Sequence, residues 1–261
     1  MELAPRIYVP AGDRRKVGHI TPSSNTVLEP LTACIAAAIE DRVSHHFTRI
    51  KVEAISLDAR HTGQFSAEKM LAAAELLADA HVDAIMWNGT SGGWNGAGAD
   101  REICAAIEDR TGIPASTSTL AQFDAMRAWD MTRYALAVPY TDDVTARIVE
   151  QYALEGFDAV GVANARVSTN REMAHVSPDT VRRLVRDADH PDAECVLVVC
   201  TGMAAAHLVP ELEAELGKPI IDSVTVVVWQ ALRMLGIEAE LPEWGSLMAG
   251  SPTRTTERTH R

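Results

Sequence analysis

The sequence predicts an α/β fold of two pseudo-symmetric halves, each with a parallel, Rossmann-like sheet, and an active site in the cleft between them. Two observations lead to this prediction. The order strand, polar loop, helix runs through the first half of the chain and starts again in the second. In addition, residues 112–118 (GIPASTS) correspond to residues 217–223 (GKPIIDS) at a constant offset of 105 residues. The expected division is residues 15–125, with a return of residues 225–248, and residues 130–224.

The strands and helices of the first half follow from their apolar patterns. The expected strands are residues 17–21, 44–56 and 83–87, and the expected helices are residues 27–40, 67–80 and 100–110. The second helix gives the strongest signal, because it is rich in Ala, Leu and Glu with apolar residues at helical spacing. The third stops at Gly112 with Pro114 behind it, which is typical of a helix C-terminus. Residues 115–119 are expected to lead into another helix that ends near Met131.

The second half repeats this order. The expected strands are residues 134–138, 159–165 and 195–199, and the expected helices are residues 143–154 and 178–188. The last strand is an apolar, β-branched run that stops at Cys200, where a small turn and then a helix are expected. Ligands of open α/β sheets bind outside the carboxyl ends of the strands, where helix N-termini offer N–H groups to anions. Cys200 is therefore the first candidate site residue, against the alternative of a small buried hydrophobe.

The composition excludes several classes of protein. With 261 residues, 47% of them hydrophobic, the chain can form a sizeable core. The net charge of -12 argues against a nucleic-acid or anionic membrane surface. Four cysteines without a Cys-x-x-Cys pair indicate neither a disulfide framework nor a metal site, so we expect reduced thiols in a cytoplasmic protein. The longest apolar stretch, near residues 224–235, is too short to span a bilayer, and residues 251–261 are expected to form a disordered tail.

Small and polar residues follow several predicted strands, at residues 22–26, 88–93, 139–142 and 200–202. Facing loops of this kind can hold a carboxylate with backbone and side-chain donors. Trp87 and Trp94 flank the second of these loops and are either core residues or walls of a substrate site. Four histidines lack a neighbouring cluster of metal ligands or carboxylates and are expected to be exposed or hydrogen-bonded in the core: His19, His61, His175 and His207. Two acidic residues, Glu29 and Asp222, are expected to cap helices.

On these loops the chain resembles the aspartate/glutamate racemase superfamily, over most of residues 16–235. The resemblance implies duplicated halves, no cofactor, and one catalytic residue from each half on opposite faces of the substrate's α-carbon. Racemases of the superfamily carry a cysteine in both loops, whereas this chain has Cys200 in the second and Gly89 in the first. Gly89-Thr90-Ser91 with a lone cysteine and Pro139-Tyr140-Thr141 is similar to the arylmalonate decarboxylase branch. Maleate isomerases of the superfamily need a nucleophilic cysteine at the position of Gly89.

The resemblance also implies roles for individual residues. Hydroxyl groups of Thr90, Ser91 and Tyr140, with backbone N–H groups beside them, would form a dioxyanion hole for the retained carboxylate. Cys200 would donate the proton, and a helix N-terminus is expected to lower its pKa, although the thiol must stay protonated until the enediolate forms. The polar loop 22–26 resembles the maleate isomerase branch instead. The expected substrate-binding residues are Pro22, Ser23, Asn25, Asn170, Thr201 and Gly202.

The sequence thus predicts a cofactor-independent decarboxylase of a malonate-type dicarboxylic acid. The mixture of loops favours a small polar diacid over an aryl one as substrate. Alternatives are a maleate isomerase-like or racemase-like isomerase, a relative of the ectoine-utilisation branch, and a diacid-binding protein without catalysis. The expected partner is a small mono- or dicarboxylate, with no nucleic acid and no membrane, and a homo-oligomer is compatible with the sequence.

Overall fold

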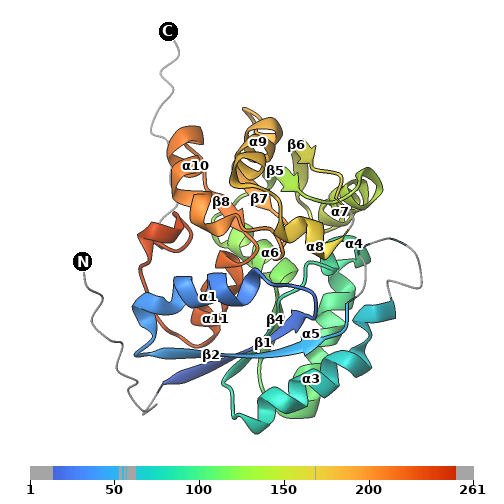
Figure 1. Ribbon diagram of the computed structural model, residues 1–261, viewed down its shortest axis with the longest axis vertical. Coiled ribbons are helices and arrows are strands. Elements are labelled where there is room, and N and C mark those ends of the chain that lie inside the picture. The colour runs from blue at the N-terminus through green and yellow to red at the C-terminus, as the bar shows by residue number, and fades with distance from the viewer. Residues whose placement is uncertain (1–13, 53–54, 56, 58–62, 168, 251–261) are drawn as a thin grey trace.

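Two four-stranded parallel sheets form the framework of the computed structural model, which describes residues 14–52, 55, 57, 63–167 and 169–250 (Figure 1). The strand orders are β2-β1-β3-β4 and β6-β5-β7-β8, and every neighbouring pair is parallel. The two orders are the same once the second half is renumbered, as a duplicated unit requires. This confirms the predicted fold class.

The strands β3, β5 and β7 are buried on both faces, apart from the first residue of β5, which explains their apolar sequences. The first sheet consists of β1 (Arg15–Pro22), β2 (Val43–Ile50), β3 (Ala84–Trp87) and β4 (Ala115–Thr117). The second consists of β5 (Arg133–Val138), β6 (Asp158–Asn164), β7 (Cys195–Val198) and β8 (Ile220–Asp222). The sequence did not predict β4 and β8, because three residues are too few for a periodic signal.

Helices cover both sheets (Figure 1). Those of the first half are α1 (Leu28–Ala36), α3 (Ala67–Asp79), α4 (Gly92–Asn95), α5 (Ala97–Thr111) and α6 (Ser118–Ala128). The later ones are α7 (Asp142–Leu154), α8 (Asn170–Ala174), α9 (Pro178–Ala188), α10 (Val209–Leu216) and α11 (Thr225–Met234). Short 3₁₀ turns lie at Ala37–Ile39, Gly63–Phe65, Ala206–Leu208 and Pro242–Trp244. As expected, α5 ends at Gly112, whose left-handed backbone (φ 71°) suits glycine.

The repeat detected in the sequence has a structural counterpart at the start of α6 and α11. Thr117 and Asp222, which lie 105 residues apart, each accept a hydrogen bond from the backbone N–H three residues later, both at 3.1 Å. Each side chain therefore satisfies a free donor at the start of its helix. The next residues of the repeat meet at the junction of the halves, where the Ser118 hydroxyl donates to the carbonyl oxygen of Ser223 at 3.1 Å.

Helix α11 packs against the first half, on α1, α6 and β3. Its apolar residues Val227 and Val228 share a core cluster with Val17, Leu28 and Met86. This contact gives a physical reason for the expected return of residues 225–248 to the first half. The boundaries of the two halves remain a prediction. Within the described residues, no helix is both long and apolar enough to cross a membrane. The predicted tail, residues 251–261, lies outside the described residues.

Candidate active site

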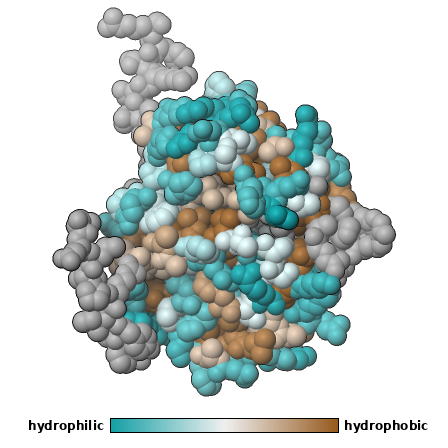
Figure 2. Space-filling view, in the orientation of Figure 1, coloured by the Kyte–Doolittle hydropathy of each residue, from teal (hydrophilic) through white to brown (hydrophobic). Residues whose placement is uncertain are grey.

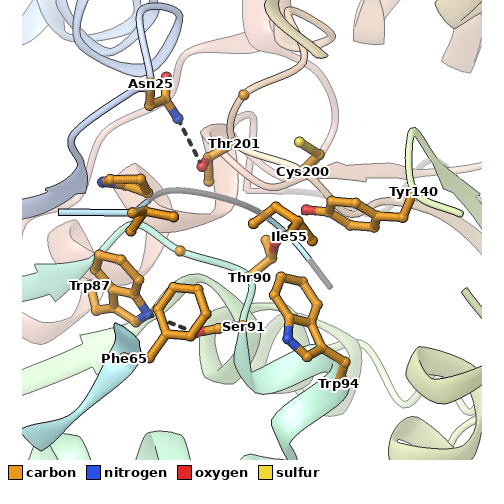
Figure 3. Close-up of a pocket in the computed structure, with 14 residues that line it drawn as sticks. Asn25, Ile55, Phe65, Trp87, Thr90, Ser91, Trp94, Tyr140, Cys200 and Thr201 are labelled. Atoms are coloured by element: carbon orange, nitrogen blue, oxygen red, sulfur yellow. Dashed lines mark hydrogen bonds between the residues drawn. The ribbon is translucent and has the colours of Figure 1, made fainter. Parts of the chain in front are cut away.

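A pocket lies where the loops after β1, β2, β3, β5 and β7 meet, between the two sheets (Figure 3). On the face shown in Figure 2, polar residues cover the helices of both halves, and hydrophobic residues show through in patches that include the middle of the molecule. The residues that line the pocket are Pro22, Asn25, Val52, Ile55, Phe65, Trp87, Gly89, Thr90, Ser91, Trp94, Tyr140, Cys200, Thr201 and Gly202. Of the predicted site residues whose side chains the structure describes, all but Ser23 line this pocket.

Hydrogen bonds join the loops of the two halves at the pocket. The Thr201 hydroxyl donates to the carbonyl oxygen of Asn88 at 2.8 Å, and the Asn25 amide donates to the Thr201 hydroxyl at 3.1 Å. The Asn25 side-chain oxygen accepts from the backbone N–H groups of Val27 and Leu28 at the start of α1. Asn25 thus caps a helix and supports Thr201, and its amide keeps one hydrogen for a ligand.

Two hydroxyl groups from opposite halves form the polar centre of the pocket. The Thr90 hydroxyl and the Tyr140 hydroxyl are 2.7 Å apart, and both side chains are buried. Burial raises the pKa of Tyr140 well above its usual value, and the neighbouring Cys200 raises it further. Tyr140 therefore stays protonated at neutral pH and can donate a hydrogen bond to a bound anion.

The rest of the pocket wall is aromatic and aliphatic. Phe65 lies 6.1 Å from Trp87 and 6.3 Å from Trp94 between ring centres, and Trp94 lies 5.4 Å from Tyr140. Figure 3 shows the rings of Phe65, Trp87 and Trp94 together on one side of the pocket, across from Cys200. The Trp87 indole N–H donates to the Ser91 hydroxyl at 3.2 Å, which leaves the Ser91 hydrogen free to donate elsewhere.

Sequence reasoning left both tryptophans open and missed Val52, Ile55 and Phe65. A signal for Val52 and Ile55 was present, because they follow β2 at the edge of the sheet where the other site loops lie. Phe65 comes from a 3₁₀ turn that carries no periodic pattern. The largely apolar wall does not suit the small polar diacid that the sequence led us to expect.

Cys200 is buried in the pocket wall, and its surroundings differ from the sequence prediction. A turn and the Ala206–Leu208 3₁₀ segment follow Cys200, and α10 begins only at Val209, so no helix dipole acts on the thiol. Burial raises the pKa of Cys200 to about 11, although hydrogen bonds with Tyr140 and with backbone N–H groups oppose the rise. The predicted lowering of the pKa is therefore wrong, since desolvation outweighs the donors.

Ser23 holds the chain together beside the pocket and does not line it. Its hydroxyl accepts from the backbone N–H of Val52 at 3.1 Å, and its carbonyl oxygen accepts from Arg49 at 2.9 Å. That Ser23 binds substrate stays a prediction, because a hydroxyl that accepts from Val52 keeps its own hydrogen to donate. Asn170 begins α8, but its side chain lies outside the described residues.

The histidines behave as expected where the structure describes them. His19 is buried, and its ring nitrogens lie 2.8 Å from His45 Nδ1 and 3.1 Å from the Asn88 amide. This network supports the residue that precedes Gly89. His175 and His207 are exposed, and His61 lies outside the described residues. Within residues 14–52, 55, 57, 63–167 and 169–250, no cluster of three or more His, Cys, Asp or Glu residues is placed to hold a metal ion.

One buried carboxyl group lies beneath each half of the site. Asp222 caps α11, and burial raises its pKa to about 6. Asp100 accepts from the Thr117 hydroxyl at 2.5 Å, and burial raises its pKa to about 7. Gly92 packs directly on this carboxyl group, since a Cβ atom there would lie 2.7 Å from Asp100 Oδ1. Sequence reasoning did not single out Asp100, because an acidic residue in the first turn of a helix is ordinarily exposed.

Fold and pocket together place the chain among α/β proteins built from two similar halves with a pocket between them. The sequence match then defines the family: residues 45–248 match the family model described as arylmalonate decarboxylase, so the chain belongs to that family. This agrees with the superfamily resemblance carried by Gly89-Thr90-Ser91 and Cys200.

Individual relatives include both decarboxylases and isomerases. The chain is 24% identical to the maleate isomerase of Alcaligenes faecalis over 246 residues, 90% of this chain and 96% of the relative. It is 31% identical to the arylmalonate decarboxylase of Bordetella bronchiseptica over 157 residues, 59% of this chain and 65% of the relative. A variant of the Nocardia farcinica maleate cis-trans isomerase with a covalently bound succinylcysteine intermediate has a similar fold, with a TM-score of 0.84, 22% identity, and 91% and 99% of the two chains covered.

Proposed function

We propose that this protein is a cofactor-independent decarboxylase of a malonate-type dicarboxylic acid, in which Cys200 protonates the product. The observation that carries the proposal is a pocket with one thiol facing hydroxyl donors. Cys200 is the one cysteine that lines it, whereas Cys34 is exposed on α1 and Cys104 and Cys195 lie elsewhere. Such a pocket suits one proton transfer to one face of an intermediate.

The donors of the pocket suit the charge that develops when carbon dioxide leaves. The carboxylate that is retained would lie against the hydroxyls of Thr90, Ser91 and Tyr140. When the bond between the α-carbon and the other carboxylate breaks, its electron pair passes into the retained group, which becomes an enediolate. Donors aimed at this group stabilise the transition state more than the substrate, by roughly 3 to 4 kcal/mol for a good donor.

The apolar wall suits the carboxylate that leaves. The side chains of Ile55 and Phe65 carry no hydrogen-bond donor, and Trp94 carries only its indole N–H. A poorly solvated carboxylate is released more readily as neutral carbon dioxide. The same wall would accommodate an aryl or alkyl substituent on the α-carbon, and we propose such a substituent in place of a small polar one.

The state of the thiol supports a proton donor over a nucleophile. With a pKa raised to about 11, Cys200 is protonated at neutral pH. The enediolate is a much stronger base, so the S–H proton passes to the α-carbon and a thiolate remains, which regains a proton from water. The backbone N–H groups of Gly202 and Met203 stabilise that thiolate while it lasts. A nucleophilic cysteine must be ionised beforehand, which a raised pKa opposes.

Maleate isomerase activity is the second candidate, because relatives of that name align with 90% of the chain. The amide hydrogen that Asn25 keeps free could hold the second carboxylate of maleate. Under this alternative Cys200 would have to act as the nucleophile. The raised pKa of its thiol therefore favours the decarboxylase.

A substrate comparison tests the proposal. The purified protein is incubated with phenylmalonate, 2-methyl-2-phenylmalonate, methylmalonate and maleate, and products are followed by carbon dioxide release and by chromatography. We expect decarboxylation of the substituted malonates, fastest with the aryl compounds, and no fumarate from maleate. Conversion of maleate to fumarate without decarboxylation of any malonate would establish the isomerase instead. Cys200→Ala serves as the inactive control.

A further inference from the structure

Trp87 fills the space where a side chain at position 89 would stand. A Cβ atom placed on Gly89 would press against Cζ2 and Cε2 of the indole and lie 2.9 Å from Cη2, all closer than the 3.0 Å that Cβ atoms keep. Gly89 is not among the glycines with positive φ, so its backbone does not require glycine. The three atoms nearest to that Cβ position all belong to the indole ring.

The indole ring is fixed at both of its ends. The backbone of Trp87 lies inside the first sheet, between Ile20 of β1 and Thr117 of β4. At the other end, the indole N–H donates to the Ser91 hydroxyl at 3.2 Å, and the whole side chain is buried. A side chain at position 89 would have to displace a buried ring that is tied to the sheet and to the loop, which is costly in a close-packed core.

The ring covers the first-half side of the pocket. Gly89 and Cys200 line the same pocket from different halves, and the Thr201–Asn88 hydrogen bond of 2.8 Å holds their loops together. Figure 3 shows the Trp87 ring across the pocket from Cys200. The indole presents carbon atoms on this side, and its N–H group is already bonded to Ser91. No exchangeable proton is therefore offered from the ring to a ligand between the two loops.

We propose that Trp87 is the specificity-determining residue that limits this pocket to one proton donor, because its ring occupies the place of a side chain at position 89. The stereochemical part of this inference rests on the proposed decarboxylase function, and the steric part does not. The sequence alone suggests that Gly89→Cys would add a second donor. The structure indicates that a cysteine side chain at position 89 has room only when Trp87 is replaced by a smaller residue.

A stability cycle tests the steric part without any assay of activity. Melting temperatures are measured for the wild type, Gly89→Ala, Trp87→Leu and the double variant, with Gly98→Ala as the matched control. Gly98 has open space around its Cβ position. We expect Gly89→Ala to lower the melting temperature by roughly 3 to 10 °C, and to lower it much less in the Trp87→Leu background. Equal losses in the two backgrounds would overturn the proposal.

A second cycle tests the stereochemical part. The variants Gly89→Cys, Trp87→Leu and Trp87→Leu/Gly89→Cys decarboxylate 2-methyl-2-phenylmalonate, and the enantiomers of the product are separated. We expect one enantiomer in excess from the wild type and both single variants, and a product at least partly racemic from the double variant. A racemic product from Gly89→Cys alone, or one pure enantiomer from a folded, active double variant, would overturn the proposal. If the wild type decarboxylates nothing, the proposed function fails, and the stability cycle still decides whether Trp87 occupies the place of a side chain.

Discussion

The loop after β3 and the loop after β7 hold equivalent places in the two halves, but they bring different chemistry to the pocket. The first offers the hydroxyls of Thr90 and Ser91 and places a glycine under the Trp87 ring. The second offers the thiol of Cys200. The duplicated fold thus determines where the two loops meet, while a few residues determine that one side presents hydroxyls and the other side a thiol, which we propose hold the anion and donate the proton.

The supports of the two loops differ as well. The first loop leads at once into α4, and the residue before Gly89 is held by His19. The second loop forms a turn, and the backbone N–H of Cys200 donates to the Ser223 hydroxyl at 3.1 Å. The absence of a helix start at Cys200 leaves burial as the dominant influence on its pKa. A raised pKa keeps the thiol protonated until a strong base forms, which is consistent with the proposed role of this loop.

The largest effect is expected from the second loop. Cys200→Ala should lower kcat by about a thousandfold or more, because it removes the proposed general acid, while malonate binding changes little. Cys200→Ser should keep a small residual activity, since an alcohol is a weaker acid than a thiol. Steady-state kinetics and calorimetric titration with malonate measure both quantities. Cys34→Ala, on the exposed face of α1, is the control, and full activity of Cys200→Ala would remove the thiol from the reaction.

The donors beside the first loop should have the next largest effect. Tyr140→Phe should lower kcat by about a hundredfold, because it removes a donor to the enediolate, with a smaller change in KM. Tyr134→Phe is the matched control, since the Tyr134 hydroxyl is buried without a hydrogen-bond partner. A raised KM with unchanged kcat would reduce Tyr140 to substrate binding.

Thiol labelling sharpens the contrast between a donor and a nucleophile. Because alkylation requires the thiolate, and burial raises the pKa of Cys200 to about 11, its rate should rise about tenfold for each pH unit between 7 and 10. Labelling by iodoacetamide is followed by mass spectrometry in a Cys34→Ala variant, and bound malonate should protect the site. A rate that levels off near pH 8 would contradict the raised pKa and return the isomerase to consideration.

The last prediction concerns the pH dependence of folding stability, through the buried carboxyl group of Asp100 beneath the first loop. The folded protein holds a proton on Asp100 up to a pKa of about 7, whereas an unfolded chain releases it near 3.8. The free energy of unfolding should therefore fall as the pH rises from about 4 to 7, and the Asp100 contribution to this fall should be absent in Asp100→Asn. Melting temperatures across this range measure the difference, and parallel curves for the two proteins would show that Asp100 is ionised throughout.

The sequence predicted the alternation of strands and helices well because apolar periodicity reflects burial directly. It also located Gly89, Thr90, Tyr140 and Cys200, since strand-end loops of a parallel sheet share one edge. Ser23 lies in the right loop but not in the pocket lining, and its role in binding stays a prediction. The failure at Cys200 has a local cause. The environment of Cys200 depended on whether a helix or a turn follows, which small residues do not specify.

Long-range packing accounts for the remaining differences. Phe65 reaches the pocket from a 3₁₀ turn, and nothing in its own neighbourhood marks it as a site residue. The relation between Trp87 and Gly89 is also invisible in the sequence, although the two are neighbours along the chain. It depends on a side-chain rotamer that the hydrogen bond to Ser91 and the sheet together select.

The central claim is that one thiol protonates an enediolate from one side. The most direct measurement is the decarboxylation of 2-methyl-2-phenylmalonate in deuterium oxide, with the product examined by mass spectrometry and chiral chromatography. The account predicts 2-phenylpropionate with one deuterium at the α-carbon, formed predominantly as one enantiomer, and no such product from Cys200→Ala. A racemic product from the wild type, or the same enantiomeric product at an undiminished rate from Cys200→Ala, would contradict it.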